Sequence, residues 1–322
     1  MITKKRHIDL HLPKSWNQCT TEELELIAAA ILAEQQRTDR YHRFDWGRVK
    51  LNVVLAVNGM EPTPLSSTEV KASGTVAASG TVATEGMGGD QEWMVKRPED
   101  SEPWPITTAQ LAALTDMLSW IDDEKSDKTI FMFPYPEMVV AIESQQTKPF
   151  TLQGPPPLLD GYTWQEYRWL TDWMQEYMRA TNAKRDATEP MAQFLAVLFK
   201  PSETMVNVPR NATLSKREWS MFKDFNPVKW QVILFWWSSL MQQLARKFPR
   251  VFKQQAVGKN KGRHAAADTP WDFYNRVTAT IQKYIGGLSE KDVNAATYGT
   301  ILQQLEMMAN EAAEMEKLKN KK

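Results

Sequence analysis

The chain of 322 residues has a hydrophobic fraction of 42% and a charged fraction of 24%, close to globular averages, which excludes a chain that is disordered throughout. Its 39 basic and 39 acidic residues cancel, so net charge provides no general attraction to nucleic acid or to an acidic membrane surface. A single cysteine, Cys19, excludes an internal disulfide and favours a reducing compartment.

Two features of the sequence predict where the chain resides. The first residues are basic, but no apolar run of signal-peptide length follows them. The most apolar stretch, residues 232–237, is far shorter than the roughly 20 residues that a membrane-spanning helix needs. We therefore expect a cytoplasmic protein with no membrane partner.

Residues 1–59 are predicted to form a small α/β element. Polar and apolar side chains alternate over residues 6–12, which is typical of a half-buried strand. A threonine and a glutamate three residues apart then form a capping-box pattern, and the apolar spacing that follows predicts an amphipathic helix over 21–37. Residues 48–57 fit either a strand or a continuing helix.

Residues 60–103 are rich in Gly, Ser, Thr and Glu and contain few large apolar side chains. Within them the hexapeptide at 72–77 is repeated immediately at 78–83. Such a segment cannot bury enough apolar surface to offset the entropy of ordering it, so we predict a disordered, acidic linker. The alternative, a β-solenoid, needs more than two repeats for stability.

Residues 104–157 are predicted to be a mixed segment. A capped amphipathic helix is expected over 105–121, and short extended runs interrupted by prolines are expected over 128–142. The proline run at 153–157 reads as a rigid connector.

Residues 158–322 are predicted to be a helical domain, which makes the protein mainly α, with a helical bundle in its C-terminal half. Caps and apolar periodicity place its helices at 163–179, 190–200, 214–225, 226–247, 269–286 and from 289 to 318. In the last of these, apolar residues alternate spacings of three and four, as in a coiled coil: Tyr298, Ile301, Leu305, Met308, Ala312 and Met315. The seam fits both packing on the chain's own bundle and pairing with another chain.

The sequence contains 13 tryptophans, and a surplus of tryptophan serves either the core or a partner interface. The helix expected at 163–179 has an unusually wide apolar arc, which suggests contacts on two sides. The candidates for partner contact are Trp164, Trp169, Trp173, Trp236 and Trp237. Their exposure decides between the two interpretations.

Residues 246–263 are the one strongly charged segment, with seven cations, no acid and two interleaved phenylalanines. A basic segment of this kind can follow the phosphates of a nucleic acid. The alternatives are a solvated helix end and loop, an acidic protein partner, or the chain's own acidic linker. The candidate anion contacts are Arg246, Lys247, Arg250, Lys253, Lys259, Lys261 and Arg263.

Possible metal and nucleophile sites near the N-terminus are weak. His7, Asp9 and His11 would share one face of the strand expected at 6–12, and they are metal ligands in kind. Only Cys19 could add a ligand nearby, and a polar outer strand face explains the pattern as well. Cys19 has no motif that would hold a base beside it.

No other motif indicates catalysis. The glycines and lysines of residues 258–262 lack the Gly-Lys-Ser/Thr and the preceding strand of a phosphate-binding loop. We therefore predict no catalytic residue, no metal and no cofactor. An enzyme of unrecognised type would need scattered side chains such as His264, Asp268 and Tyr274 to converge in space.

Two segments, residues 12–24 and 159–167, resemble parts of uncharacterised prophage-encoded, tail-region proteins of the Bacteroides group. In that family "Leu-Pro-x-x-Trp" is followed by a threonine-capped helix, as in Leu12 to Thr20 here. The resemblance implies a role in tail assembly or a chaperone-like role, and it carries over no functional residues.

We therefore expect a non-catalytic structural or assembly protein that acts by binding another protein, and the resemblance implies that both belong to a phage tail system. The alternative is a nucleic-acid-binding accessory protein that uses residues 246–263.

Overall fold

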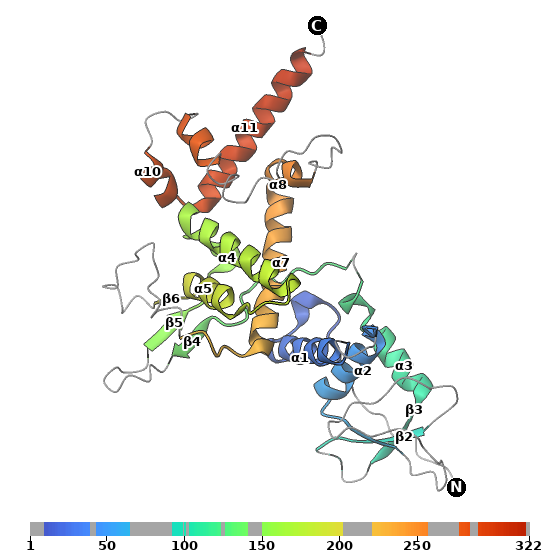
Figure 1. The fold of residues 1–322 in the computed structure, drawn as a ribbon. Helices are drawn as coiled ribbons and strands as arrows, with labels where there is room; N and C mark the ends of the chain where they lie inside the picture. The colour runs from blue at the N-terminus through green and yellow to red at the C-terminus, as the bar shows by residue number, and fades with distance from the viewer. Residues whose placement is uncertain are drawn as a thin grey trace, which may run out of the picture. The chain divides into compact units, whose positions relative to one another are not determined.

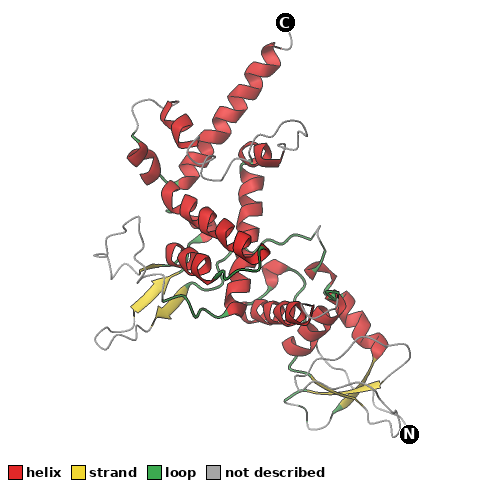
Figure 2. Ribbon diagram, in the orientation of Figure 1, coloured by secondary structure: helices red, strands yellow, loops and turns green. Residues whose placement is uncertain are grey.

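The computed structural model describes residues 10–38, 43–64, 92–98, 100, 103–123, 126–140, 150–201, 221–256, 277–283 and 289–319 (Figure 1). Helices dominate these ranges, as the sequence predicts, and the strands are short (Figure 2). The chain divides into two compact units, residues 1–129 with 227–232, and residues 130–226 with 233–322.

The first unit contains the helices η1 (Trp16–Gln18), α1 (Thr21–Thr38), α2 (Trp46–Val57), α3 (Thr108–Asp116) and η2 (Ser119–Ile121). The prediction of a helix beginning after Thr20 is confirmed, and the residues at its helical spacing, such as Ile27, are buried. Residues 48–57 are helical, because the carboxylate of Asp45 accepts a hydrogen bond from the backbone N–H of Arg48 at 3.3 Å and begins α2.

The first unit also contains an antiparallel sheet of β1 (Glu61–Pro64), β2 (Glu92–Lys96) and β3 (Trp104–Thr107), in that order. The prediction of disorder over 60–103 is therefore wrong at 61–64 and 92–96. Trp93 and Val95 lie on the same face of β2, and both side chains are buried in the core. This burial offsets the entropy that is lost when the strand becomes ordered. The hexapeptide repeat lies outside the described residues.

The strand expected at 6–12 is not found in the part of it that the structure describes. Residues 10–12 have no regular structure. The backbone N–H of His11 donates to the Asn58 side chain at 2.9 Å, and the Asn58 amide donates back to the carbonyl oxygen of His11 at 3.0 Å. These bonds satisfy the backbone of His11 without a neighbouring strand.

The second unit contains η3 (Pro157–Leu159), α4 (Trp164–Asn182), α5 (Thr188–Leu198), most of α7 (Pro227–Lys247), α8 (Pro249–Ala256), helical residues 277–283, α10 (Glu290–Ala295) and α11 (Tyr298–Lys319). The helix predicted from a capping box at Thr163 and Glu166 is confirmed, since both bonds of the box are present. The helix predicted from 226 to 247 is also found.

A second antiparallel sheet consists of β4 (Glu137–Val140), β5 (Phe150–Gln153) and β6 (Lys200–Pro201). The chain leaves β5 through Gly154, whose N–H donates to the carbonyl oxygen of Pro136 at 2.8 Å. A Cβ atom at residue 154 would collide with the backbone oxygen of Tyr135 and the ring of Phe133. Glycine is therefore required at this close approach.

The single helix expected from residue 289 onward is wrong, because it is two helices, α10 and α11. Ala296 has an extended conformation between them, and its carbonyl oxygen accepts from the N–H of Trp164 at 2.8 Å. The N–H of Tyr298 donates to the carbonyl oxygen of Tyr162 at 3.0 Å. This short pairing with the segment before α4 uses the backbone groups that a continuous helix would need.

Candidate functional site

Three of the five candidate tryptophans lie in the core of the second unit. Trp164 is fully buried, its indole N–H donates to Thr278 Oγ1 at 3.3 Å, and its ring stacks on Tyr167 with centroids 5.8 Å apart. Trp236 and Trp237 are also buried. Because these three tryptophan side chains are buried, they belong to the core and offer almost no surface to a partner.

The surroundings of the α7 tryptophans explain their burial. Trp236 packs edge-on against Phe133 with ring centroids 4.8 Å apart, and Trp237 packs perpendicular to Phe194 at 5.1 Å. Aromatic pairs in this geometry add to the stability gained from burial alone. The tryptophan surplus thus serves an aromatic core that joins α5, α7 and the segment before β4.

Trp169 and Trp173 are half-buried and lie on α4. Trp169 lines a groove of about 730 Å³ between the N-terminal part of α4 and the short helix α10. Polar side chains from both helices complete its walls, among them Thr163, Gln165, Glu166, Lys291 and Asn294.

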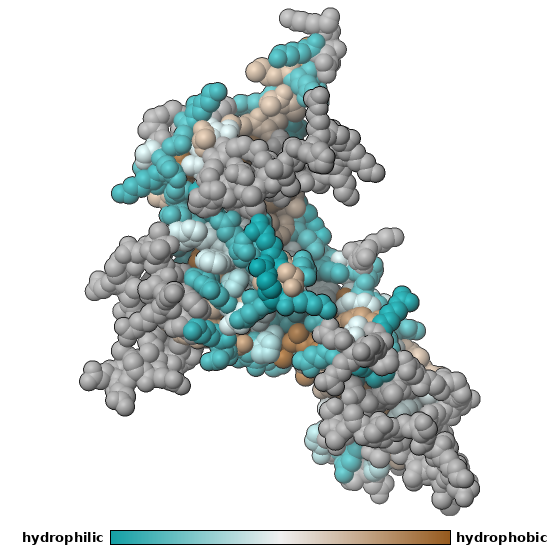
Figure 3. All heavy atoms as spheres, viewed as in Figure 1, coloured by the Kyte–Doolittle hydropathy of each residue, from teal (hydrophilic) through white to brown (hydrophobic). Residues whose placement is uncertain are grey.

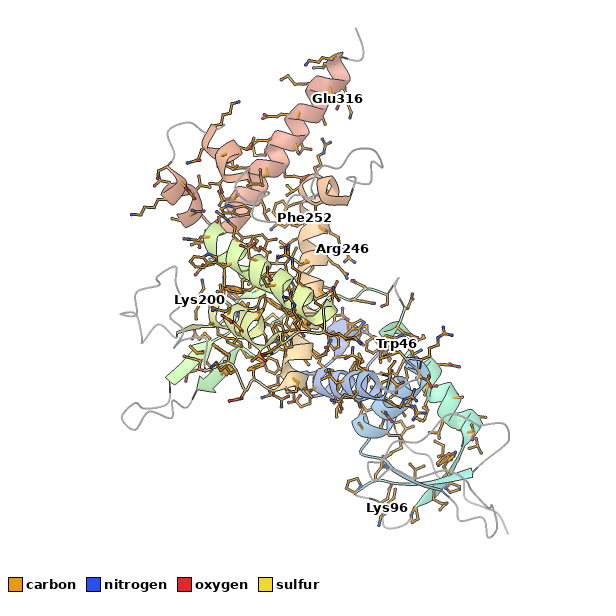
Figure 4. The ribbon with its side chains drawn as sticks, in the orientation of Figure 1. Trp46, Lys96, Lys200, Arg246, Phe252 and Glu316 are labelled. Carbon is orange, nitrogen blue, oxygen red and sulfur yellow. The ribbon has the colours of Figure 1, made fainter. Side chains whose placement is uncertain are left out.

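Neighbouring side chains already engage the polar groups of this groove. Lys200, labelled in Figure 4, donates from Nζ to the carboxylate of Glu166 at 3.0 Å and lies 3.5 Å from the ring centroid of Tyr162. The guanidinium of buried Arg168 donates to the Asn294 side chain at 3.3 Å. The groove therefore presents the half-buried indole of Trp169 beside amide groups and the exposed side chains of Ser289, Glu290 and Lys291.

The basic segment is only partly described. Arg246 and Lys247 are exposed at the end of α7, and Figure 4 labels Arg246. The side chain of Lys253 in α8, and Lys259, Lys261 and Arg263, lie outside the described residues. Arg250 is half-buried, and its guanidinium donates to the carbonyl oxygen of Ala309 in α11 at 3.2 Å.

The N-terminus of α8 is occupied by a carboxylate of the chain itself. Glu306 of α11 accepts hydrogen bonds from the backbone N–H groups of Arg250, at 3.0 Å, and Val251, at 3.1 Å. Backbone N–H groups at a helix start are those that would otherwise hold a phosphate. This contact joins residues 56 positions apart and could not be found from sequence spacing.

The first turn of α11 belongs to the core, and its later turns do not. Tyr298, Ile301 and Leu302 are buried, whereas the side chains of Met307, Met315 and Leu318 are 50%, 65% and 65% exposed. Figure 1 shows α11 continuing past α8, and in Figure 3 apolar and hydrophilic residues are mixed along this part. We call residues 307–319 the outer segment of α11.

The remaining sequence candidates show no reactive geometry where the structure describes them. Burial, assisted by the charge of Glu23, raises the pKa of the Cys19 thiol to about 12, which disfavours the thiolate. His11 Nε2 lies 2.7 Å from a carboxylate oxygen of Glu23. Among the described side chains, no three His, Cys, Asp or Glu residues gather as metal ligands would.

Other sequence candidates fall outside the described residues, namely His7, Asp9, His264, Asp268, Tyr274 and residues 258–262. Within the described ranges, no helix is long and apolar enough to cross a membrane.

Comparisons with protein-family models, with curated proteins and with solved structures find no match for this chain. Among the described residues, large apolar side chains face solvent at several places. They include Phe131 and Met132 before β4 as well as Met307, Met315 and Leu318 in the outer segment of α11, and only the latter set lies on one continuous helix.

Proposed function

We propose that the protein is a non-catalytic structural or assembly protein that acts by binding another protein through the outer segment of α11. The observation that carries this proposal is the exposure of Met315 and Leu318, each 65%, on a regular helix. Methionine adapts its shape to different apolar surfaces and is common at protein-binding helices. An amphipathic helix presented in this way is a frequent means of partner recognition.

The base of α11 supports this role, because it holds the helix in place. Tyr298 stacks on Tyr167 with ring centroids 4.9 Å apart, and Glu306 binds the start of α8. The outer segment, about 20 Å long at 1.5 Å per residue, therefore extends from a packed helix and needs little ordering when a partner binds.

The assignment to a phage tail system rests on the resemblance of residues 12–24 and 159–167 to prophage-encoded tail-region proteins. A cytoplasmic location is supported by the single cysteine, which fits a reducing compartment. A tail or assembly component of the same system is the partner that this resemblance suggests.

The test compares the full chain with Met315→Glu and with the matched control Gln303→Glu, which adds the same charge at an exposed position off the apolar seam. Each protein is used as bait in a lysate of cells that express the neighbouring genes, and bound proteins are identified by mass spectrometry. We expect one or more proteins bound by the parent and the control but lost with Met315→Glu. An unchanged set would contradict the proposal.

A second candidate function is nucleic-acid binding through the basic segment, and the exposure of Arg246 and Lys247 favours it. Affinity would then fall steeply as salt rises. Binding of labelled DNA and RNA to Arg246→Ala/Lys247→Ala, measured against salt, tests this function, and an unchanged salt slope would contradict it.

A further inference from the structure

We propose that the groove beside Trp169 binds a neutral saccharide, with the indole against the apolar C–H face of a sugar ring and the surrounding side chains hydrogen-bonded to its hydroxyl groups. The groove shares no residue with the outer segment of α11, so this site is independent of the proposed function. The inference follows from the position of the indole, the fixed walls of the groove and the balance of charge on its lining.

Trp169 lies on a face of α4 that is turned away from the core. It is five residues after the buried Trp164 and five before the buried Met174, which places it about 140° around the helix from both. Within the part of the chain that the structure describes, its indole makes no hydrogen bond and no ring contact. The half-buried ring therefore has an apolar surface and an N–H donor that the core does not use.

Hydrogen bonds tie together the two helices that form the groove. The backbone N–H of Trp164 donates to the carbonyl oxygen of Ala296, directly after α10, at 2.8 Å. One turn farther along α4, the buried Arg168 donates to the Asn294 side chain at 3.3 Å. The groove is thus formed before a ligand arrives, and its volume of about 730 Å³ is usual for a small-molecule site. Binding to such a site loses little conformational entropy.

The polar lining of the groove contains both donors and acceptors. The Gln165 amide makes no hydrogen bond among the described residues, and Asn294 engages Arg168 through Oδ1, which leaves its NH₂ group for a ligand. The exposed side chains of Glu290 and Lys291 add an acceptor and a donor at the rim. Because a hydroxyl group both donates and accepts, a sugar ring can match this mixed set.

The charges on the lining balance one another. Lys200 neutralises Glu166 at 3.0 Å, and Glu290 is adjacent to Lys291 in the sequence. A nucleic-acid strand needs an excess of cations, which this lining does not present. A wholly apolar ligand would bury the polar groups without hydrogen bonds, which is costly. A neutral saccharide, which has an apolar ring face and a rim of hydroxyl groups, meets both conditions.

The test uses the full chain and four neutral oligosaccharides, namely maltohexaose, cellohexaose, xylohexaose and N-acetylated chitohexaose. Isothermal titration calorimetry should detect binding of one or more of them, and salt should not change the affinity because a neutral ligand forms no ion pairs. Trp169→Ala should weaken this binding about tenfold, as expected for the loss of one stacked ring. The matched control is Trp173→Ala, which removes a half-buried indole one turn along α4 and outside the lining, and it should bind as the parent does.

A conservative variant and a spectroscopic signal locate the site. Trp169→Phe keeps an aromatic face and should recover part of the affinity. In spectra of the chain with isotope-labelled tryptophan, the indole resonance missing from Trp169→Phe is the one that the oligosaccharide should shift. Circular dichroism confirms that each variant is folded.

Three outcomes would overturn the inference. The first is that none of the four oligosaccharides binds. The second is an equal loss of binding in Trp169→Ala and Trp173→Ala. The third is that adenosine or a short oligonucleotide binds in the groove and the oligosaccharides do not, which would assign the indole to a nucleobase.

Discussion

Glu306 of α11 caps the first turn of α8, with a carboxylate oxygen 3.0 Å from the backbone nitrogen of Arg250. The same oxygen lies 3.1 Å from the nitrogen of Val251, so one side chain satisfies two N–H groups that the helix itself cannot. The negative charge also lies at the positive end of the α8 dipole. A single residue thus ties α8 to the base of the helix that we propose as the contact element.

Removal of this cap should release α8. Glu306→Ala leaves the two N–H groups without the carboxylate, which costs about 1 kcal/mol by comparison with other helix caps. Hydrogen exchange followed by mass spectrometry should show faster exchange in residues 249–256. Glu314→Ala removes the same charge from an exposed position of α11 and should leave exchange in α8 unchanged. Equal effects of the two variants would show that charge alone, and not the cap, holds α8.

Replacement of Trp164 should destabilise the second unit strongly. Trp164→Ala deletes a fully buried side chain and its bond to Thr278, and losses of this kind cost about 3–5 kcal/mol. Urea denaturation measures the change. The half-buried Trp173 is the matched control, and Trp173→Ala should cost distinctly less. A loss at Trp173 as large as that at Trp164 would contradict the assignment of Trp164 to the core.

The carboxyl of Asp172 should make stability depend on pH. Burial raises its pKa from 3.8 to about 6, although Arg168 and Arg179 partly offset the effect. Because the fold favours the protonated form, the contribution of Asp172 is present at low pH and is lost as pH rises through about 6. Asp172→Asn should therefore raise the stability at pH 7.5 by about 1 kcal/mol after allowance for solvent screening.

Thermal unfolding of the parent and of Asp172→Asn at pH 5 and pH 7.5 measures this contribution. The expected result is a gain that is largest at pH 7.5 and about half as large at pH 5, where the carboxyl of the unfolded chain, with its ordinary pKa of 3.8, is still mostly ionised. Glu176→Gln, a change of the same type one turn along α4, is the control, and a gain of equal size there would argue for a general effect of charge.

The Cys19 thiol should react slowly in the folded protein. Its pKa of about 12 leaves little thiolate at pH 8, and the side chain is only partly accessible. Absorbance assays with an aromatic disulfide reagent should give a much lower rate in buffer than in 6 M guanidinium, where the thiol is exposed. A fast reaction in buffer would indicate an activated thiol and reopen the case for a nucleophile.

Elements with local signals were predictable from the sequence. The helices α1, α4 and α7 begin where threonine caps or an Asn-Pro start predicts them, because capping bonds join residues only three positions apart. The mainly α class follows from these signals. The apolar seam of α11 was also predictable, because the alternation of three and four residues between its apolar side chains can be seen in the sequence.

Features that depend on distant partners were not predictable. Strand β2 exists because it pairs with β1 and β3, and the break between α10 and α11 exists because Ala296 bonds to Trp164. The hydrogen bonds from the backbone N–H groups of Val251 and Arg250 to Glu306 join residues that are 55 and 56 positions apart. Pairing at such separation is set by packing of the whole unit, which local propensity does not encode.

The tryptophans show the division most clearly. Composition alone established that this chain has a surplus of indole rings, and it favoured the core over a partner interface without saying which rings serve which use. The tertiary structure placed Trp164, Trp236 and Trp237 inside, because other aromatic rings surround them there. It placed Met307 and Met315 of the outer segment of α11 in solvent, because no described element packs over them.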